Sequence, residues 1–167
     1  MALARLIIHM DVNETMIVSD PAGGDSCEDC LNKVVCKQAI VRRKGNGFTW
    51  ADGRPLATAG PPPELHYWDV PEGCSRFYEQ PELKKKYAKT FCEDLAVYKG
   101  LHSELEAALR TDETDTRLVR GAHHFVLPAV WALLESLKGS RFTLVLRTFG
   151  SDLEAVAAAL DAFAERT

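Results

Sequence analysis

The sequence predicts an α/β protein with parallel strands, because strand-like and helix-like segments alternate along it. Leu3–Met10 (LARLIIHM) is an apolar run without regular polar alternation, which is typical of a strand buried on both faces of a sheet. Phe142–Leu146 is a second run of this kind. Helical spacing of apolar residues follows the two runs, at Cys27–Arg43 and at Asp152–Phe163.

The middle of the chain interrupts this alternation. Residues 44–73 are dense in Gly and Pro, so we expect an irregular excursion with a short hairpin around Asp52-Gly53. Glu82–Leu109 has a helical pattern, which predicts two helices with a break near Gly100. One domain is therefore divided into a first core segment (1–43), an irregular and helical insertion (44–120) and a second core segment (121–167).

A helix over His123–Leu137 is expected to open the second core segment. Pro128 is compatible with it either in a first turn or at a kink, and Gly139 is placed to end it. His123 and His124 would face different directions on this helix, which argues against a shared metal. His9, inside the first strand, is interpreted as a core histidine.

The composition indicates a globular protein and argues against a nucleic-acid-binding or membrane-spanning one. The 167 residues are 46% hydrophobic and 26% charged, which is ordinary for one globular domain. The net charge of −4 and the absence of a basic face argue against nucleic acid as a partner. No run of about 18 apolar residues is present, so we expect no membrane span. Five cysteines, an odd number, fit a reducing compartment, and we expect a cytoplasmic protein.

The first strand ends in a distinctive string, Asp11-Val-Asn13-Glu-Thr15. A carboxylate at the carboxyl edge of a parallel sheet lies where ligands bind in such folds, and Asp11 can act as a nucleophile on phosphorus. Mg²⁺ usually screens the repulsion between such a carboxylate and a phosphoryl group. Thr15 can brace the loop through its hydroxyl group.

The second strand ends in a matching way, in FTLVLRTFGSD. Thr148 follows the apolar run and precedes Gly150 and a helix N-terminus. Its hydroxyl group and the neighbouring backbone N–H groups are suited to holding a phosphate oxygen. Ser151 either reinforces this contact or caps the helix.

Together these strings resemble the first two motifs of the haloacid dehalogenase (HAD) superfamily. The resemblance implies a Rossmann-like parallel sheet of the HAD type, with a cap inserted between the two motifs. It implies Mg²⁺-dependent phosphomonoester hydrolysis or phosphoryl transfer on a small phosphorylated substrate, through an aspartyl-phosphate on Asp11. Asp11 and the backbone carbonyl of Asn13 would be Mg²⁺ ligands, and Thr148 would hold the phosphoryl group.

The chain departs from that family in two ways. Asn13 stands where the phosphatases have a second aspartate, and an amide cannot exchange protons in general acid–base catalysis. The lysine and the acidic pair of the third and fourth motifs have no counterpart after Thr148. Two strands also make a marginal sheet, so we expect a further chain or a C-terminal segment to complete it. The alternatives are a non-catalytic HAD-derived binding or regulatory module, a fragment of a larger protein, or a generic α/β domain.

Two other groups of residues leave alternatives open. Gly23 and Gly24, in DPAGGD, either let the backbone approach a ligand or form a simple turn. Cys27, Cys30 and Cys36 are interpreted mainly as ordinary thiols, with zinc binding and redox pairing as the alternatives. The sequence identifies neither the substrate nor the oligomeric state.

Overall fold

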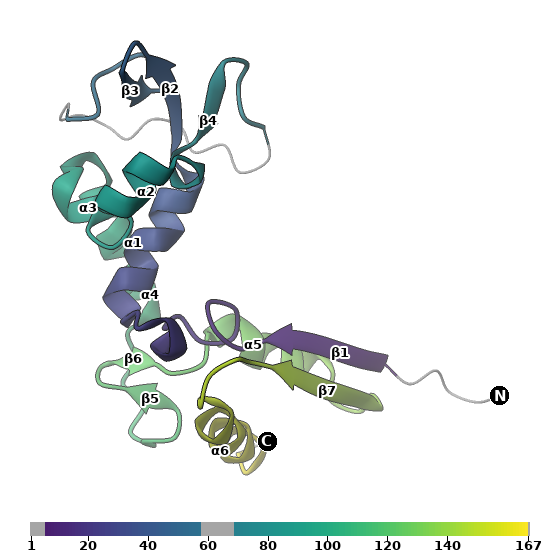
Figure 1. Ribbon diagram of the computed structural model, residues 1–167. Coiled ribbons are helices and arrows are strands. Elements are labelled where there is room, and N and C mark those ends of the chain that lie inside the picture. The colour runs from purple at the N-terminus through teal and green to yellow at the C-terminus, as the bar shows by residue number, and fades with distance from the viewer. Residues whose placement is uncertain (1–5, 58–68, 167) are drawn as a thin grey trace. The chain divides into compact units, whose positions relative to one another are not determined.

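The structure is a computed structural model that describes residues 6–57 and 69–166. The chain forms two compact units, Met1–Cys27 with Ala108–Thr167 and Glu28–Ala107, and each is described by itself (Figure 1). Residues 28–43, placed in the first core segment by the sequence analysis, belong to the second unit. The described part of the chain is mixed α/β, as the sequence predicts, with one parallel sheet of two strands and two small antiparallel sheets.

The parallel sheet lies in the first unit and joins the two ends of the sequence. Strand β1 (Leu6–Asp11) pairs with β7 (Phe142–Arg147), and the register runs from Leu6 opposite Phe142 to Asp11 opposite Arg147. Both strands were expected from their apolar runs, and the structure extends the second by one residue. This register brings the carboxyl ends of the two strands side by side.

Helices α5 (Pro128–Ser136) and α6 (Leu153–Ala164) build the core of this unit. The rings of Trp131 and Phe163 stack between them, with centroids 4.6 Å apart. Met10 of β1 and Leu146 of β7 pack against the same core, which contains a further set of buried residues: Val12, Met16, Ile17, Leu118, Phe125, Val126, Val130, Val156, Ala159 and Ala162.

The opposite face of the sheet is more open. Side chains alternate between the faces of a strand, so Ile7 and His9 point away from the side of Met10. Ile7 is 56% exposed and His9 is exposed as well. The expectation that His9 is a core histidine is therefore wrong, because this face of β1 is not covered by another described element.

A small hairpin replaces the expected start of the helix at His123. Strands β5 (Val119–Arg120) and β6 (His123–His124) pair antiparallel, with Gly121 at a φ of +60° in the turn. The helix begins later, at Pro128, where the missing N–H of proline leaves no hydrogen bond unmade. Of the two expectations for Pro128, the first turn is the one observed.

Helix α1 (Cys27–Gln38), which belongs to the second unit from Glu28 onward, is shorter than expected. The β-branched pair Ile40-Val41 leaves the helix and starts β2 (Ile40–Lys44), which lies between β3 (Gly47–Trp50) and β4 (Cys74–Arg76). The hairpin of β2 and β3 turns at Gly45. Asp52-Gly53 forms a further turn, in which the N–H of Gly53 donates to the carbonyl of Trp50 at 2.9 Å.

Short helices complete this unit. They are η2 (Phe77–Glu79), α2 (Pro81–Tyr87), α3 (Phe91–Asp94), η3 (Ala96–Tyr98) and α4 (Lys99–Leu109). The helical stretch is interrupted not near Gly100 but earlier, at residues 88–90 and at Leu95, and Gly100 lies in α4. The core surrounds Trp50, whose indole contacts the rings of Phe77, Phe91 and Tyr98.

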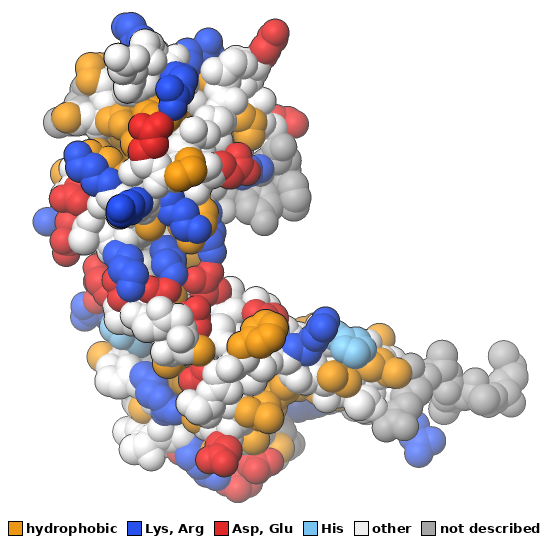
Figure 2. Space-filling model, in the orientation of Figure 1, with side chains coloured by type: hydrophobic (Ala, Val, Ile, Leu, Met, Phe, Trp, Pro, Cys, Tyr) orange, Lys and Arg blue, Asp and Glu red, His pale blue; other side chains and the backbone are white. Residues whose placement is uncertain are grey.

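The described surface carries charges of both signs. On the face in Figure 2, Lys and Arg side chains alternate with Asp and Glu over both units. Arg43 of β2, for example, pairs with Glu82 of α2 at 2.8 Å. None of the described helices combines the length and the apolar character that crossing a membrane requires.

Candidate functional site

The candidate site lies where β1 and β7 end. The N–H of Val12 donates to the carbonyl of Arg147 at 2.9 Å, so the pairing continues one residue beyond Asp11. Asp11 and Thr148 therefore leave adjacent strand ends, as expected for two parallel strands. Asp11 is exposed, and its carboxylate makes no hydrogen bond or ion pair with another described residue. It is thus accessible to a ligand.

Asn13 connects the two strand ends through its side chain. Its Oδ1 accepts a hydrogen bond from the hydroxyl of Thr148 at 2.9 Å, and its Nδ2 donates to Oδ2 of Asp152 at 3.0 Å. These contacts bridge more than 130 residues of sequence. Each end of the Asn13 amide thus makes one hydrogen bond to another residue, which fixes the orientation of the side chain.

Thr148 continues the same set of hydrogen bonds. Its Oγ1 accepts from the N–H of Gly150 at 3.0 Å while its proton goes to Asn13. A phosphoryl oxygen would have to compete with Asn13 for that proton, because a hydroxyl group has a single donor. The contact expected between Thr148 and a phosphoryl group thus requires the bond from Thr148 to Asn13 to open.

Gly150 is placed where a side chain does not fit. A Cβ at this position would lie 2.7 Å from Oδ2 of Asp152 and 3.0 Å from the Cβ of Ala22. The loop around Ala22 therefore packs directly on the turn that links β7 and α6. Glycine is required here for close approach, not for a positive φ.

The loop after β1 contains η1 (Pro21–Gly23), with Asp20 as its N-cap. Oδ1 of Asp20 accepts from the N–H of Gly23 at 3.1 Å, and Gly24 has a left-handed φ of +73°. Asp20 and Asp25 exchange backbone hydrogen bonds at 3.1 and 2.9 Å, which closes the loop. Both glycines serve this turn, and the turn lies beside the candidate site through Ala22.

A group of carboxylates that was not predicted from the sequence is formed by Glu14, Asp20 and Asp25. One carboxylate oxygen of each lies within 4.8 Å of those of the other two, and Asp25 is buried. Glu14 has a φ of +54°, a region that residues other than glycine seldom adopt. Hard oxygen ligands of this kind suit Mg²⁺ or Ca²⁺. The signal in the sequence was the recurrence of acids at 11, 14, 20 and 25.

Two predicted site residues stay outside these contacts. Thr15 and Ser151 are exposed, and their hydroxyl groups make no hydrogen bond with another residue in the described ranges. The proposed brace by Thr15 is thus not formed. Ser151 does not cap α6 either, because the N-cap position of that helix is Asp152.

The cysteines are five free thiols. Among the described residues, no cysteine belongs to a group of three or more side chains with metal-ligand spacing. Burial raises the pKa of the Cys36 and Cys92 thiols to about 12, so both stay protonated at neutral pH. Of the open interpretations, ordinary thiols agree best with these surroundings.

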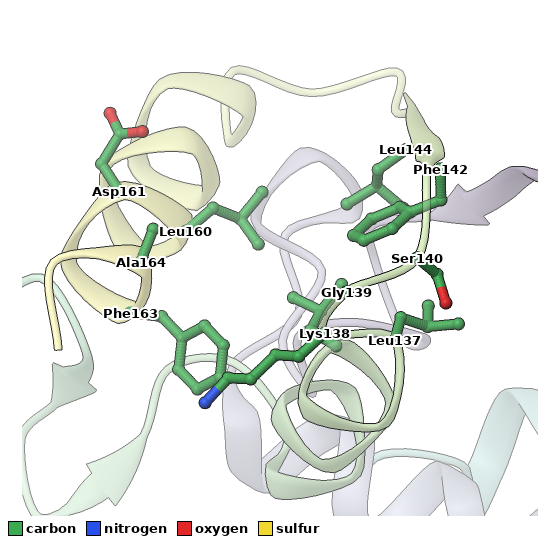
Figure 3. A pocket seen from close by; sticks show the side chains of 11 residues that line it. Leu137, Lys138, Gly139, Ser140, Phe142, Leu144, Leu160, Asp161, Phe163 and Ala164 are labelled. Atoms are coloured by element: carbon green, nitrogen blue, oxygen red, sulfur yellow. The ribbon is translucent and has the colours of Figure 1, made fainter. Parts of the chain in front are cut away.

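A separate groove of about 400 Å³ lies by the amino end of β7, away from Asp11 and Thr148. Phe142 and Leu144 face Leu160 and Phe163 of α6 across it, with Lys138 and Asp161 among the lining residues (Figure 3). It is mainly apolar, and none of the predicted site residues lines it.

Comparison with known proteins does not assign the chain to a family. No protein-family model matches the chain, and neither a curated protein nor a solved structure is significantly similar to it. The function must therefore be argued from the residues at the ends of β1 and β7.

Proposed function

We propose that this chain is a hydrolase or phosphotransferase of the HAD type, which acts on a small phosphorylated substrate through an aspartyl-phosphate on Asp11. The observation that carries the proposal is the adjacency of the two strand ends. Asp11, whose carboxylate is exposed, and Thr148 leave neighbouring strand ends, and Asn13 contacts Asp152, the N-cap residue of α6. A helix N-terminus favours a bound anion, and an exposed aspartate at the same edge of the sheet is suited to attack the phosphorus of that anion.

The reaction has two steps at Asp11. A carboxylate oxygen forms a bond to phosphorus while the bond from phosphorus to the leaving-group oxygen breaks, and that oxygen takes up a proton from solvent water, because Asn13 cannot supply one. Water then attacks the phosphorus of the aspartyl-phosphate, which restores Asp11 and releases inorganic phosphate. An acceptor alcohol in place of water makes the reaction a transfer.

Mg²⁺ would neutralise charge between the Asp11 carboxylate and the phosphoryl oxygens. The carboxylate of Asp11 and the backbone carbonyl of Asn13 are the groups that would hold it by resemblance to the HAD family. A carboxylate oxygen and a backbone carbonyl oxygen are hard donors of the kind that Mg²⁺ prefers. Glu14, Asp20 and Asp25 offer a second set of oxygen donors nearby in sequence.

A second candidate function is a binding or regulatory module with the same fold that does not turn its ligand over. The observation in its favour is the hydrogen bonding of Asn13. An amide held by Thr148 and Asp152 can neither protonate a leaving group nor activate water. This candidate predicts that phosphorylated ligands bind without hydrolysis.

We also infer a cytoplasmic location and a further β-strand that completes the parallel sheet. Free thiols fit a reducing compartment. Parallel sheets are normally covered on both faces, whereas Leu6 and Ile7 are 46% and 56% exposed. We propose that another chain supplies this strand.

The test is hydrolysis of an aryl phosphate, with and without Mg²⁺, by the parent and by Asp11→Asn. We expect Mg²⁺-dependent turnover in the parent and a loss of about 10³-fold or more in the variant, because the nucleophile is removed. Asp161→Asn, an exposed aspartate on α6, is the matched control and should keep parental activity. Near-parental activity of Asp11→Asn would exclude Asp11 as the nucleophile. Binding of inorganic phosphate without turnover would favour the second candidate.

The position of the ion is tested in the same assay with Glu14→Gln. If Asp11 and the Asn13 carbonyl hold Mg²⁺, the concentration for half-maximal activation should stay at the parental value. A clear increase in that concentration would instead assign the ion to the group of Glu14, Asp20 and Asp25.

A further inference from the structure

The Asp152 carboxylate, at the N-terminus of α6, was not among the predicted site residues, yet it contacts Asn13 directly. Its Oδ2 lies 3.0 Å from Nδ2 of Asn13. We infer that Asp152 is a positioning residue of the candidate site, which fixes the orientation of the Asn13 amide and, through it, the hydroxyl of Thr148. The role of Asp152 in catalysis rests on the proposed function, whereas its role in stability and in phosphate binding does not.

The chemistry of the side chains gives this hydrogen-bond chain one direction. An ionised carboxylate only accepts, so the Asn13 end that faces Asp152 must be the NH₂ group. The carbonyl end then faces Thr148 at 2.9 Å and can only accept, which directs the hydroxyl proton toward Asn13. The N–H of Gly150 donates to the same hydroxyl oxygen at 3.0 Å. Thr148 alone would tolerate either orientation of the amide, because a hydroxyl both donates and accepts.

This arrangement also explains the amide at position 13. A carboxylate there would still accept from Thr148 but would face Asp152 at hydrogen-bond distance, where two like charges repel. In this chain the carboxylate that contacts position 13 comes from Asp152, the N-cap residue of α6. The two side chains should therefore be exchangeable, since a carboxylate at position 13 could accept both from Thr148 and from an amide at position 152.

The exchange is tested with Asn13→Asp, Asp152→Asn and the double variant, with Asp161→Asn as control. We expect Asn13→Asp to lower the unfolding midpoint by about 3–10 °C, because it places two carboxylates in contact. Asp152→Asn should have a smaller effect, since its carbonyl still accepts from Asn13. The double variant should recover at least half of the loss, and the control should match the parent.

A second measurement separates positioning from simple packing. Asn13→Asp should weaken inhibition by inorganic phosphate and raise KM for the aryl phosphate by about 10-fold, because Thr148 and the helix N-terminus are no longer held in place. Both values should recover in the double variant. A purely structural contact would restore the unfolding midpoint without restoring phosphate affinity.

Additive effects of the two single variants, with no recovery in the double variant, would overturn the inference. Recovery of the midpoint alone would overturn the positioning role. The proposed function fails in a different way: none of the proteins would hydrolyse the aryl phosphate with Mg²⁺. The recovery of the midpoint and of phosphate binding in the double variant would still support the inference in that case.

Discussion

A single residue, Gly150, shows how tightly the candidate site is packed. The hydrogen bond from its N–H to Thr148 brings the backbone close to Asp152 and Ala22. Neither neighbour can withdraw freely, since Asp152 is held by Asn13 and Ala22 lies in the closed loop of Asp20 and Asp25. The absence of a side chain at 150 is thus part of the site.

We expect Gly150→Ala to lower the free energy of unfolding by about 1–3 kcal/mol, the usual cost of forcing extra volume into a packed region. Gly100→Ala is the contrasting control, because a Cβ there meets nothing within 4 Å and the residue lies inside α4. It should stabilise its unit by about 0.5–1 kcal/mol. Urea unfolding measures both. Parental stability of Gly150→Ala would contradict the contact between Ala22 and the turn after β7.

Among the helices, α6 has an end that forms ion pairs with the polar segment 113–117. Arg117 pairs with Asp115 at 2.9 Å and with Glu165 at 2.8 Å, and Arg166 pairs with Asp115 at 3.2 Å and with Glu113. The hydrogen bond from Arg166 lowers the pKa of Glu113 to about 2, and the one from Arg117 lowers the pKa of Asp115 to about 2. The network thus links the end of α6 to this segment.

The pH dependence of stability follows from these two carboxylates. Their pKa is lower in the folded chain than in the unfolded chain, so their contribution is complete above about pH 5 and is lost as the pH falls toward 2. We expect Arg166→Gln to lower the unfolding midpoint at pH 6 and to differ little from the parent near pH 2. High salt should reduce the difference at pH 6, because the pairs are exposed.

Arg141→Gln is the control for this prediction, since the Arg141 side chain makes no ion pair with a described residue. Its midpoint should follow the parent at every pH. If Arg166→Gln and the parent differed by the same amount at pH 2 and pH 6, the contribution of Arg166 would be packing and not charge.

At the scale of the whole molecule, the parallel sheet is incompletely covered by the described residues. The described sheet has two strands, with α5 and α6 packed on the side of Met10 and Leu146. Leu6 and Ile7 are exposed on β1, and hydrophobic side chains lie at the surface of this part in Figure 2. The apolar groove of Phe142 and Leu160 adds a second uncovered surface beside β7. A two-stranded sheet is marginal by itself, so another strand is the expected partner.

We expect the isolated chain to self-associate through β1 when no other strand is supplied, because an open apolar edge pairs readily. Ile7→Lys should reduce this association in sedimentation velocity over a range of concentrations, with little loss of stability. Val34→Lys, at an exposed apolar residue of α1, is the control and should associate like the parent. A parent that stays monomeric throughout, or equal effects of both variants, would contradict the open edge as an interface.

Much of the candidate site could be anticipated from local patterns. The apolar runs predicted β1 and β7, and parallel strands require their carboxyl ends to meet, so Asp11 and Thr148 were expected to lie side by side. Apolar spacing likewise predicted α6 within a residue at each end. These features depend on neighbours in sequence or on a general property of parallel sheets, which a pattern of residues encodes directly.

The remaining features depended on residues distant in sequence. Asp152 became the partner of Asn13 because the two strand ends meet, and nothing within either segment indicates that pair. Ile40-Val41 left the predicted helix because β3 and β4 offered strand partners, and His9 proved exposed because its face of the sheet has no described cover. Propensity and periodicity report the local chain, whereas partners and burial are set by which surfaces meet in three dimensions.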